Sequence, residues 1–516
     1  MSERRSVVLI RPPTQMGRLH KIVSAQHPIN ILYVAATLRE NGFEPHLFDY
    51  EVEPWEPERL VAEIDRLDPL FVGVSCMTPL IVTVHAIAGT VKRAFPRLPT
   101  VVAGAHPTAL PRETLADFPD FDIAMLGEGE FTSVALCQRI SEGRDLSGLL
   151  GVGYRVERGG GIVLNGERPI FKGLDQIPFP ARDMLRMELY PGASKSGLSA
   201  GVNRSTQVFT SRGCPFLCTF CAIPVAHNHK VRFRSPESVR RELAESVRRW
   251  GFTHVTLHDD TFTLSERRVR EISEAVGSLG VSWDCDTRVD QVTREMLIAM
   301  GQNGCARIAF GVESGSDRIL KLIKKDVTVE QIKNAFAWAK EAGMQTCGYF
   351  IVGAHPDETP GEVEMTRDLI HAVEPDFAHI SVGVPYPGTE LETEMVKDGL
   401  IFDRSWERYM EYDTVPGWRT RHCTAEELVA HQKRLIKEYF YRPAYIWSRF
   451  KKAGLKLARV RSTGDLAACA KEYAYWARSA WIGYAFVNQT VKGKMKLNPV
   501  SAQKEERRAL SGAAAL

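Results

Sequence analysis

Three cysteines stand close together in the segment SRGCPFLCTFC, where Cys214, Cys218 and Cys221 are separated by three and then two residues. A loop of this length lets three thiolates converge on one metal centre, and Gly213 and Pro215 supply the tight turn that it needs. A 4Fe–4S cluster held by only three protein thiolates leaves one iron open for a small molecule. The type and spacing of these residues therefore favour a metal site with three ligands from one loop.

Two other interpretations of these cysteines stay open on the residues alone. A structural zinc site needs a fourth Cys or His at suitable spacing, and His227 or His229 would complete it. Alternatively the three are buried thiols, which is what we expect of the seven widely spaced cysteines. These seven are Cys76, Cys137, Cys285, Cys305, Cys347, Cys423 and Cys469.

From residue 206 to residue 420 the chain alternates apolar strand patterns with helical segments. Six such strand–helix units predict a partial (β/α)6 TIM-like barrel, whose functional residues lie at the carboxyl ends of the strands. The strands are expected at 206–211, 253–260, 282–288, 306–314, 344–353 and 377–387.

The spacing C-x3-C-x2-C, with Phe220 before the last cysteine and the first barrel strand before the loop, resembles the radical S-adenosylmethionine (SAM) superfamily. The resemblance implies a 4Fe–4S cluster on the three cysteines, whose open iron binds the amino and carboxylate groups of SAM. It also implies that the reduced cluster cleaves SAM to methionine and a 5′-deoxyadenosyl radical, which abstracts hydrogen from an unactivated C–H bond. The protein then positions the cofactor and excludes water.

The same resemblance implies SAM contacts at later strand ends. HDDTFT (258–263) follows the second strand, where acidic side chains accept from the SAM ammonium, and GVESGS (311–316) corresponds to the segment that binds the ribose. GYFIVG (348–353) corresponds to the glycine motif near adenine, although each acidic residue is also a candidate helix cap. The predicted SAM-binding residues are Phe220, Asp259, Asp260, Glu313, Ser314 and Gly353.

Residues 1–150 predict a doubly wound, Rossmann-like α/β domain. Apolar strands are expected at 7–10, 70–75, 100–105 and 122–128, with helices Ile29–Asn41 and Leu80–Phe95 between them. In such sheets ligands bind at the carboxyl ends of the strands.

An α/β domain before a radical SAM barrel resembles the cobalamin-binding subgroup of that superfamily. The segments AGAHPTALP (103–111) and LGEGE (126–130) resemble the loops that approach the corrin in this subgroup. The cobalamin-binding residues that the resemblance implies are Thr14, Ser75, Thr78, Gly104, His106, Pro107, Thr108, Gly127, Glu128 and Gly129.

One departure concerns the cobalt ligand. Domains that bind cobalt through histidine carry Asp-x-His-x-x-Gly after the first strand, whereas this loop reads RPPTQMGRLH. His20 and His27 lie near it in sequence, but we expect surface or capping roles for them, and for His106 a role in shaping its loop. The subgroup commonly lacks the histidine ligand, so cobalamin remains the expected cofactor.

Beyond these two regions we expect an irregular linker over 151–205, a helical basic and aromatic cap over 421–500 and a disordered tail over 501–516. Between Gln432 and Arg461 the sequence has ten Lys or Arg residues and one acid. This stretch resembles the C-terminal extension of anaerobic magnesium-protoporphyrin cyclase and related enzymes. A solvated helix face and a membrane-surface patch are both open interpretations, and residues 473–486 suggest an aromatic lid.

Composition and net charge limit the classes of partner and the location that we expect. With 516 residues and a net charge of +3, the chain is too close to neutral for wholesale nucleic-acid binding. It shows no signal-peptide pattern and no apolar run of membrane-spanning length, so we expect a cytoplasmic protein with reduced cysteines. Peripheral contact with a membrane is an open interpretation.

The expected function is a cobalamin-dependent radical SAM enzyme, with methyl transfer to an unactivated carbon as the preferred reaction. Oxidative ring closure of the porphyrin-cyclase type is the alternative, and a non-catalytic zinc or nucleic-acid-binding protein is the alternative class. The expected partners are a small-molecule, lipid or tetrapyrrole substrate and an external electron donor such as flavodoxin or ferredoxin.

Overall fold

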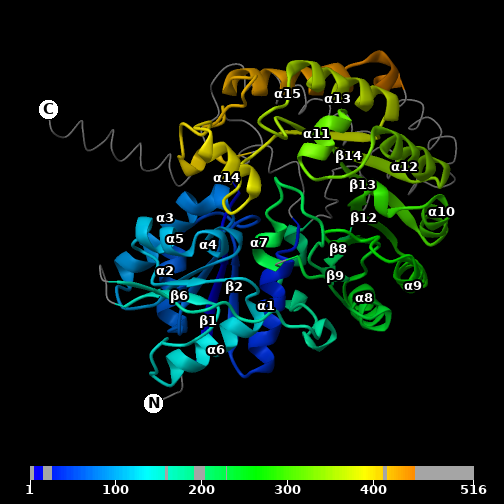
Figure 1. The fold of residues 1–516 in the computed structure, drawn as a ribbon. Coiled ribbons are helices and arrows are strands. Elements are labelled where there is room, and N and C mark those ends of the chain that lie inside the picture. The colour runs from blue at the N-terminus through cyan, green and yellow to red at the C-terminus, as the bar shows by residue number, and fades with distance from the viewer. Residues whose placement is uncertain are drawn as a thin grey trace.

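The computed structural model describes residues 5–14, 26–156, 161–190, 204–227, 229–410 and 415–447. These residues form two α/β units, each built on a mainly parallel sheet, with the N-terminal unit in blue and cyan and the second unit in green and yellow (Figure 1). The predicted fold class is confirmed. His20, Cys469, the 473–486 segment and the 501–516 tail lie outside the described residues.

The N-terminal sheet has seven strands in the order β2-β1-β3-β4-β5-β6-β7. The strands from β1 to β5 pair in parallel. Strand β2 lies on one side of β1 and the later strands lie on the other side, so the order of strands reverses between β1 and β3 and creates a topological switch point. Their bounds are β1 Ser6–Arg11, β2 Glu44–Asp49, β3 Val72–Ser75, β4 Thr100–Ala103, β5 Ile123–Met125, β6 Val152–Arg155 and β7 Ile162–Leu164.

Helices cover both faces of this sheet because β1 buries both of its faces. Val8 and Ile10 pack with α2, α3 and α5, while Val7 and Leu9 pack with α1 and α6. The helices are α1 Ile29–Glu40, α2 Pro57–Leu67, α3 Ile81–Ala94, α4 Ala105–Ala109, α5 Pro111–Asp117 and α6 Glu130–Ser141.

The segment after residue 150 differs from the irregular linker that we expected. Strands β6 and β7 pair antiparallel with β5 and with each other, and so extend the N-terminal sheet. Their sequences, VGYR and IVL, are too short to show a strand pattern, and their pairing depends on a neighbour far along the chain. After them come short 3₁₀ turns, which end at Leu189.

The second sheet has six strands, all parallel, in the order β15-β14-β13-β12-β11-β8, and it confirms the six predicted barrel strands. A separate two-stranded ribbon pairs β9 with β10. The bounds are β8 Ser205–Val208, β9 Ser211–Arg212, β10 Arg232–Phe233, β11 His254–Leu257, β12 Ser282–Arg288, β13 Cys305–Glu313, β14 Gln345–Val352 and β15 Phe377–Val382.

Helices shield the outer face of this sheet, where they enclose the largest apolar core. They are α8 Pro236–Trp250, α9 Glu266–Gly277, α10 Arg294–Gln302, α11 Asp317–Leu322, α12 Val329–Glu341, α13 Pro360–Val373 and α15 Ala425–Phe440. Helix α7 Ile223–His227 follows the cysteine loop, and α14 Glu390–Lys397 packs in a separate cluster with Tyr409 and Trp418. No helix of the described ranges is long and apolar enough to cross a membrane.

Helix α15 shows how the C-terminal region begins. It lies beside α13 (Figure 1), and Gln432 Nε2 donates to the carbonyl of Ile380 on β15 at 3.0 Å. Leu435 and Tyr439 are buried in the barrel core. The first part of the expected cap is therefore the last outer helix of the barrel, and its aromatic residue Tyr439 does not face a membrane or solvent.

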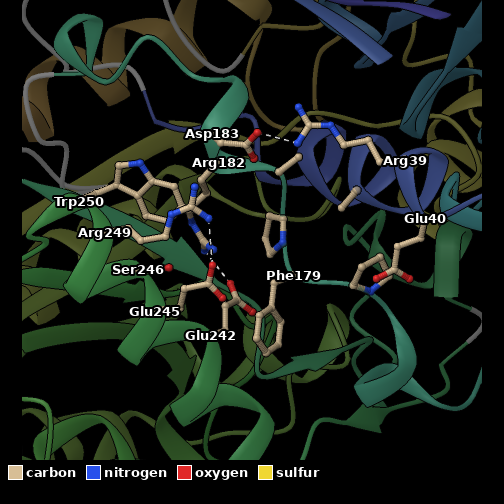
Figure 2. Close-up of a pocket in the computed structure, with 14 residues that line it drawn as sticks. Arg39, Glu40, Phe179, Arg182, Asp183, Glu242, Glu245, Ser246, Arg249 and Trp250 are labelled. Atoms are coloured by element: carbon tan, nitrogen blue, oxygen red, sulfur yellow. Dashed lines mark hydrogen bonds and ion pairs between the residues drawn. The ribbon is translucent and has the colours of Figure 1, made fainter. Parts of the chain in front are cut away.

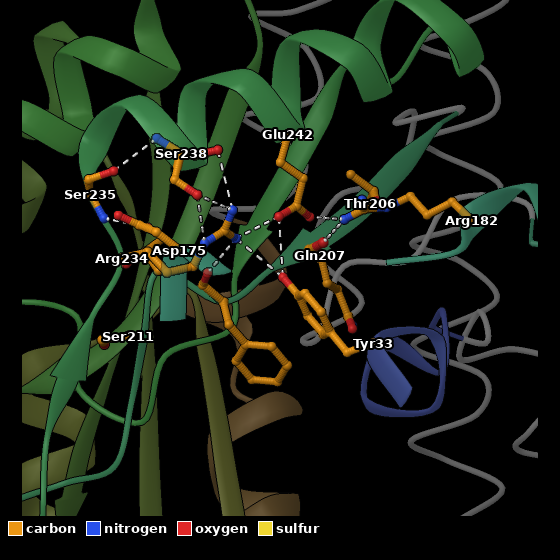
Figure 3. A network of polar contacts seen from close by, with 12 residues as sticks. Tyr33, Asp175, Arg182, Thr206, Gln207, Ser211, Arg234, Ser235, Ser238 and Glu242 are labelled. Atoms are coloured by element: carbon orange, nitrogen blue, oxygen red, sulfur yellow. Dashed lines mark hydrogen bonds and ion pairs between the residues drawn. The ribbon is translucent and has the colours of Figure 1, made fainter. Parts of the chain in front are cut away.

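A buried ion network joins the two α/β units (Figure 3). Glu242 on α8 pairs with Arg182 at 2.6 Å and with Arg234 at 2.5 Å, and it accepts a hydrogen bond from Tyr33 on α1 at 3.2 Å. Burial raises the pKa of Glu242, but the two arginines outweigh burial and leave the pKa below its usual value. The carboxylate is therefore charged and bridges both units.

The outer side of this junction carries a half-open pocket of about 240 Å³ (Figure 2). It lies between α1, α8 and the segment 178–183, and an ion pair of 2.7 Å between Arg39 and Asp183 borders it. Its lining contains none of the residues that we predicted for the cofactors. It belongs to the junction between the units and not to the strand ends.

We expect Glu242→Gln to lower the free energy of unfolding by about 3 kcal/mol, because it leaves two buried arginines without their counter-charge. Chemical denaturation measures the change. Glu245→Gln on the same helix is the control: Glu245 is partly exposed and pairs with Arg249 at 3.0 Å, so its loss should change stability by less than about 1 kcal/mol. Equal effects of the two variants would contradict a structural role for the buried network.

Candidate functional site

The cysteine loop leaves the barrel between β9 and β10, whose antiparallel pairing closes its base. Gly213 begins the loop with φ of 91°, and a Cβ atom there would lie 2.1 Å from the carbonyl oxygen of Lys230. Only glycine avoids both the strained backbone and this overlap. Cys214 is buried, and Cys218 and Cys221 are partly exposed. The loop thus carries all three thiols on a backbone path that requires Gly213.

The three thiols are close enough to influence one another. Burial, together with the neighbouring Cys218 and Cys214, raises the pKa of Cys221 to about 12. Among the described residues no three His, Cys, Asp or Glu side chains already form a ready-made metal site. The donor set, three thiols on one loop, fits iron as a soft-ligand site, and metal binding would displace the thiol protons.

The two histidines that would complete a zinc site have other partners. His227 Nδ1 lies 3.6 Å from Glu128, and His229 Nδ1 lies 3.2 Å from the carbonyl oxygen of Phe216. His229 is exposed. One ring nitrogen of each histidine thus has a partner other than the thiols, which favours a site with three protein ligands.

Asp259, at the end of β11, holds the turn before the cysteine loop. Its Oδ1 accepts from the backbone N–H groups of Thr210 and Ser211 at 2.6 and 3.0 Å, and its Oδ2 accepts from their hydroxyl groups at 2.5 and 2.7 Å. Both oxygens are engaged and the residue is buried. Asp259 therefore positions this turn, and its role as an acceptor for the SAM ammonium stays a prediction.

The next two residues hold the loop itself. Asp260 Oδ2 accepts from the backbone N–H of Gly213 at 2.9 Å, and Thr261 Oγ1 lies 3.5 Å from Cys214 Sγ. Asp260 is partly exposed, so of the two predicted ammonium acceptors it is the one that keeps access to a ligand.

The predicted ribose-binding residues lie at the end of β13. Glu313 accepts from Lys325 Nζ at 2.9 Å, and both side chains are buried. Ser314 is fully buried, and its Oγ accepts from the backbone N–H of Ser316 at 3.2 Å. Glu313 and Lys325 both influence the pKa of Cys218, which places this pair beside the cysteine loop.

The predicted adenine site is at the end of β14. The backbone N–H of Gly353 donates to the carboxyl group of Glu358, which is fully buried. Burial raises the pKa of Glu358 to about 8. Phe220 is partly buried between the barrel core and a second cluster that contains Tyr409 and Trp418. Gly353 and Phe220 thus both lie at packed positions of the barrel edge.

The predicted cobalamin residues gather at the carboxyl edge of the N-terminal sheet. Thr108 Oγ1 donates to the Gly104 carbonyl at 2.7 Å and accepts from the Gly127 N–H at 3.0 Å, which ties together the segments after β4 and β5. Thr14, after β1, bonds through its N–H and hydroxyl to Glu51 at 2.8 and 3.0 Å. The other members of the set are placed on the same edge: Ser75 ends β3, Pro107 lies in α4 and Gly129 precedes α6.

His106 connects the segments after β3 and β4. Its Nδ1 lies 3.4 Å from Thr78 Oγ1, and its ring meets Trp406 edge-on at 4.8 Å. The ring is fully buried, and burial lowers the pKa of His106 to about 4. Its Nε2 is buried without a hydrogen-bond partner in the described part of the chain. A ligand with polar groups at this edge therefore fits the site.

Glu128, one of the predicted cobalamin-binding residues, pairs with two arginines of the barrel unit. Its carboxylate accepts two hydrogen bonds from Arg232 at 2.8 and 2.5 Å and lies 3.3 Å from Arg212. Arg212 also pairs with Glu130 at 2.6 Å. These contacts join the end of the N-terminal sheet to the ribbon that carries the cysteine loop. The side chain of Glu128 thus serves the junction between the units.

His27 does not face the cobalamin edge as a free ligand. It is buried, its Nδ1 lies 3.3 Å from Thr206 Oγ1 on β8, and its ring meets Tyr190 edge-on. Burial lowers the pKa of His27 to about 3. His27 is therefore a buried packing residue, and the surface role that we expected for it is wrong.

The edges of the two sheets meet. Helix α4, which follows β4, contacts α7, which follows the cysteine loop. A Cβ atom built on Gly388 would touch both Val225 on α7 and Ala109 on α4, so the three segments converge. The carboxyl edge of the N-terminal sheet therefore lies against the mouth of the barrel, beside the three thiols.

Two basic residues that lie next to the thiols were not among the site residues predicted from the sequence. Arg288 Nη1 donates to Cys218 Sγ at 3.5 Å, and Lys325 reaches the same thiol electrostatically. Arg288 ends β12, so its position at a strand end was the available signal. Lys325 follows α11 and carries no such signal.

A thiol loop at the mouth of a parallel barrel, facing the edge of a doubly wound domain, defines a cobalamin-dependent radical SAM enzyme. Residues 208–370 match the Radical SAM superfamily, and residues 17–137 match the B12 binding domain. The predicted cofactors, a 4Fe–4S cluster, SAM and cobalamin, are confirmed by these matches at the level of the domain families.

Relatives that match most of the chain support the same class. The chain is 31% identical over 439 residues to the uncharacterized methyltransferase PH0819 of Pyrococcus horikoshii, covering 85% of this chain and 93% of that protein. It is 27% identical to cytidylyl-2-hydroxyethylphosphonate methyltransferase of Streptomyces wedmorensis, with coverages of 77% and 83%. It is also 27% identical to the anaerobic magnesium-protoporphyrin IX monomethyl ester cyclase of Rubrivivax gelatinosus, with coverages of 78% and 72%.

Among solved structures, the methyltransferase TsrM from Kitasatospora setae, with cobalamin and a [4Fe-4S] cluster bound, shares the fold. Its TM-score is 0.68 at 18% identity, over 93% of this chain and 99% of that one. The protein belongs to the radical SAM superfamily, in the group with a B12-binding domain. It is an enzyme of this group, which excludes the non-catalytic zinc or nucleic-acid-binding alternative.

We expect Gly213→Ala to reduce iron incorporation to less than about half of the wild-type value, because backbone strain and the overlap with Lys230 cost about 1–3 kcal/mol in the loop. Iron and sulfide analysis after anaerobic reconstitution measures it. Gly280→Ala is the matched control: Gly280 also has positive φ, at 67°, but a Cβ atom there meets nothing within 4 Å. Loss of iron in both variants would show that strain alone, and not the loop path, is responsible.

Proposed function

We propose that this enzyme is a methyltransferase that adds a SAM-derived methyl group to an unactivated carbon of a small molecule. The observation that carries the proposal is the contact of α4 with α7, because it brings the B12-binding edge and the thiol loop to the same place. The relatives support the reaction type, since two of the three named above are methyltransferases.

The chain's own residues would bind the cofactors, orient them and enclose the site. In the proposed assignment Cys214, Cys218 and Cys221 hold the cluster, while the edge around Gly104 and His106 holds the corrin. When bound, the cluster, SAM and cobalamin supply the radical that activates a C–H bond and the methyl group that the carbon receives. The contacts of Asp259 and Asp260 keep the loop in place, and the packed junction between the units limits the access of water.

The inside of the barrel offers groups for a substrate. On β14 Phe350 and Val352 belong to the outer core, so Tyr349 and Ile351 face inward. Tyr349 meets His379 of β15 edge-on at 5.3 Å. Aromatic and hydrogen-bonding side chains in this position suit a small organic substrate, with lipids and tetrapyrroles as the larger members of that class.

Two further parts of the proposal concern partners and location. An external one-electron donor such as flavodoxin or ferredoxin would reduce the cluster, since radical SAM chemistry needs this electron. Cytoplasmic location and peripheral membrane contact stay predictions. In the described part of the basic segment, Trp447 is 71% exposed, and it is the aromatic residue there that could meet such a surface.

The products of a single-turnover reaction distinguish methyl transfer from its alternative. With reduced, reconstituted enzyme, SAM and a candidate substrate, we expect S-adenosylhomocysteine and 5′-deoxyadenosine together with a methylated product. The 27% identity to the cyclase favours oxidative ring closure as the second candidate. 5′-Deoxyadenosine alone, with an oxidised product and no methyl gain, would establish that reaction and refute methyl transfer.

Cysteine variants test the cluster assignment. We expect anaerobically reconstituted wild type to be brown, with about four iron and four sulfide per chain, and Cys214→Ala, Cys218→Ala and Cys221→Ala each to lose the colour. Cys137→Ala is the control, because Cys137 is a fully buried core residue of the N-terminal unit and should leave iron unchanged. Full iron in any variant of the three loop cysteines would remove that residue from the ligand set.

Gly104 tests the corrin assignment. Its φ is 118°, and a Cβ atom there would lie 2.5 Å from the carbonyl oxygen of Cys76, so Gly104→Ala must move the segments after β3 and β4 apart. We expect cobalamin affinity to fall about tenfold or more, with iron content unchanged. Corrin absorbance after gel filtration measures it. Gly148→Ala, with positive φ but open space around its Cβ, is the control and should retain wild-type affinity.

A further inference from the structure

Arg288 reaches the cysteine loop from inside the barrel. On β12 Trp283 and Cys285 lie in the outer core, so Arg288, at an alternate position, faces inward. Its Nη1 donates to Cys218 Sγ at 3.5 Å. The side chain is only 6% exposed, so water does not compete freely for this sulfur. The contact is thus a shielded N–H···S hydrogen bond to one of the three loop cysteines.

Three further contacts hold the guanidinium in this orientation. Its Cζ lies 3.7 Å from the ring centre of Phe216, a residue of the cysteine loop itself. Asp290 accepts from Nε and Nη2 at 2.9 and 3.0 Å, and the carbonyl oxygen of Lys325 also accepts from Nη2. A guanidinium held by a ring, a carboxylate and a carbonyl keeps one N–H group directed at the sulfur without further loss of entropy.

The charges around Cys218 show which effect dominates. Arg288 is paired with Asp290, and Lys325 is paired with Glu313 at 2.9 Å. Each cation therefore has its own carboxylate, and little net positive charge remains beside the thiol. What remains specific to Cys218 is the directed hydrogen bond. Hydrogen bonds to the ligand sulfurs are among the factors that set the reduction potential of iron–sulfur clusters.

We propose that Arg288 is a positioning residue that raises the reduction potential of the cluster by donating a hydrogen bond to the Cys218 sulfur. The inference rests on the proposed assignment of Cys218 as a cluster ligand. A thiolate gains electron density when the cluster takes up an electron, so a fixed N–H donor stabilises the reduced form more than the oxidised form. Arg288 would thus make the cluster easier for the electron donor to reduce.

An anaerobic redox titration of the reconstituted enzyme, followed by electron paramagnetic resonance without SAM, tests the inference. Only the difference in strength of this hydrogen bond between the two oxidation states changes the potential. At the wild-type midpoint we therefore expect Arg288→Gln to lower the ratio of reduced to oxidised cluster severalfold, by at most about tenfold. Arg307→Lys is the matched control, because Arg307 is a buried arginine of the neighbouring strand that pairs with Asp284 at 2.6 Å. Its ratio should equal the wild-type ratio.

Arg288→Lys keeps the positive charge beside Asp290 but loses the fixed guanidinium N–H group, so we expect a smaller shift in the same direction. If Arg288→Gln does not retain iron, this second variant decides the question. An unchanged midpoint in a variant with full iron overturns the inference and leaves the proposed function intact. A shift of similar size in Arg307→Lys also overturns it. Wild-type protein that binds no cluster would overturn the proposed function as well.

Discussion

The pair formed by Arg212 and Glu130 is the contact on which the geometry of the site depends. Arg212 lies two residues before Cys214, and Glu130 begins α6 directly after the edge of the N-terminal sheet. With Arg232 and Glu128 it forms a partly buried set of opposite charges. Separating these charges would leave them unpaired in a poorly hydrated junction, which is costly. The thiol loop is thereby tied at its base to the B12-binding unit.

The fully buried network around Glu242 also holds the two units together through paired charges, at another part of the junction. Tyr33 of α1, Arg182 of the connecting segment and Arg234 after β10 all meet one carboxylate (Figure 3). A polar network that is satisfied only in one arrangement specifies the relative position of its parts more strictly than apolar packing does. We infer that the two edges face each other in a single, defined register.

The sequence alone allowed the six barrel strands and most of the N-terminal sheet to be predicted, because buried parallel strands are apolar runs such as VVLI and because the cysteine spacing is local. It did not allow β2, or β6 and β7, whose pairing is decided by β5. It also did not show which groups Asp259 and Glu128 contact. A carboxylate at a strand end looks the same in sequence whether it meets a ligand, a backbone N–H or an arginine from another unit. Only the fold reveals those partners.

Thiols, carboxylates and basic residues therefore have different roles in the site. The thiols supply the ligands, and carboxylates one element away fix the loop: Asp259 through the turn before it and Asp260 through Gly213. Arg288 and Lys325 approach the same loop from β12 and from the segment after α11, and each is neutralised by its own carboxylate. Because the charges cancel locally, the barrel mouth can bury cations beside the thiols without repelling the cationic sulfonium of SAM. A cluster with an open iron and a positively charged co-substrate require this balance.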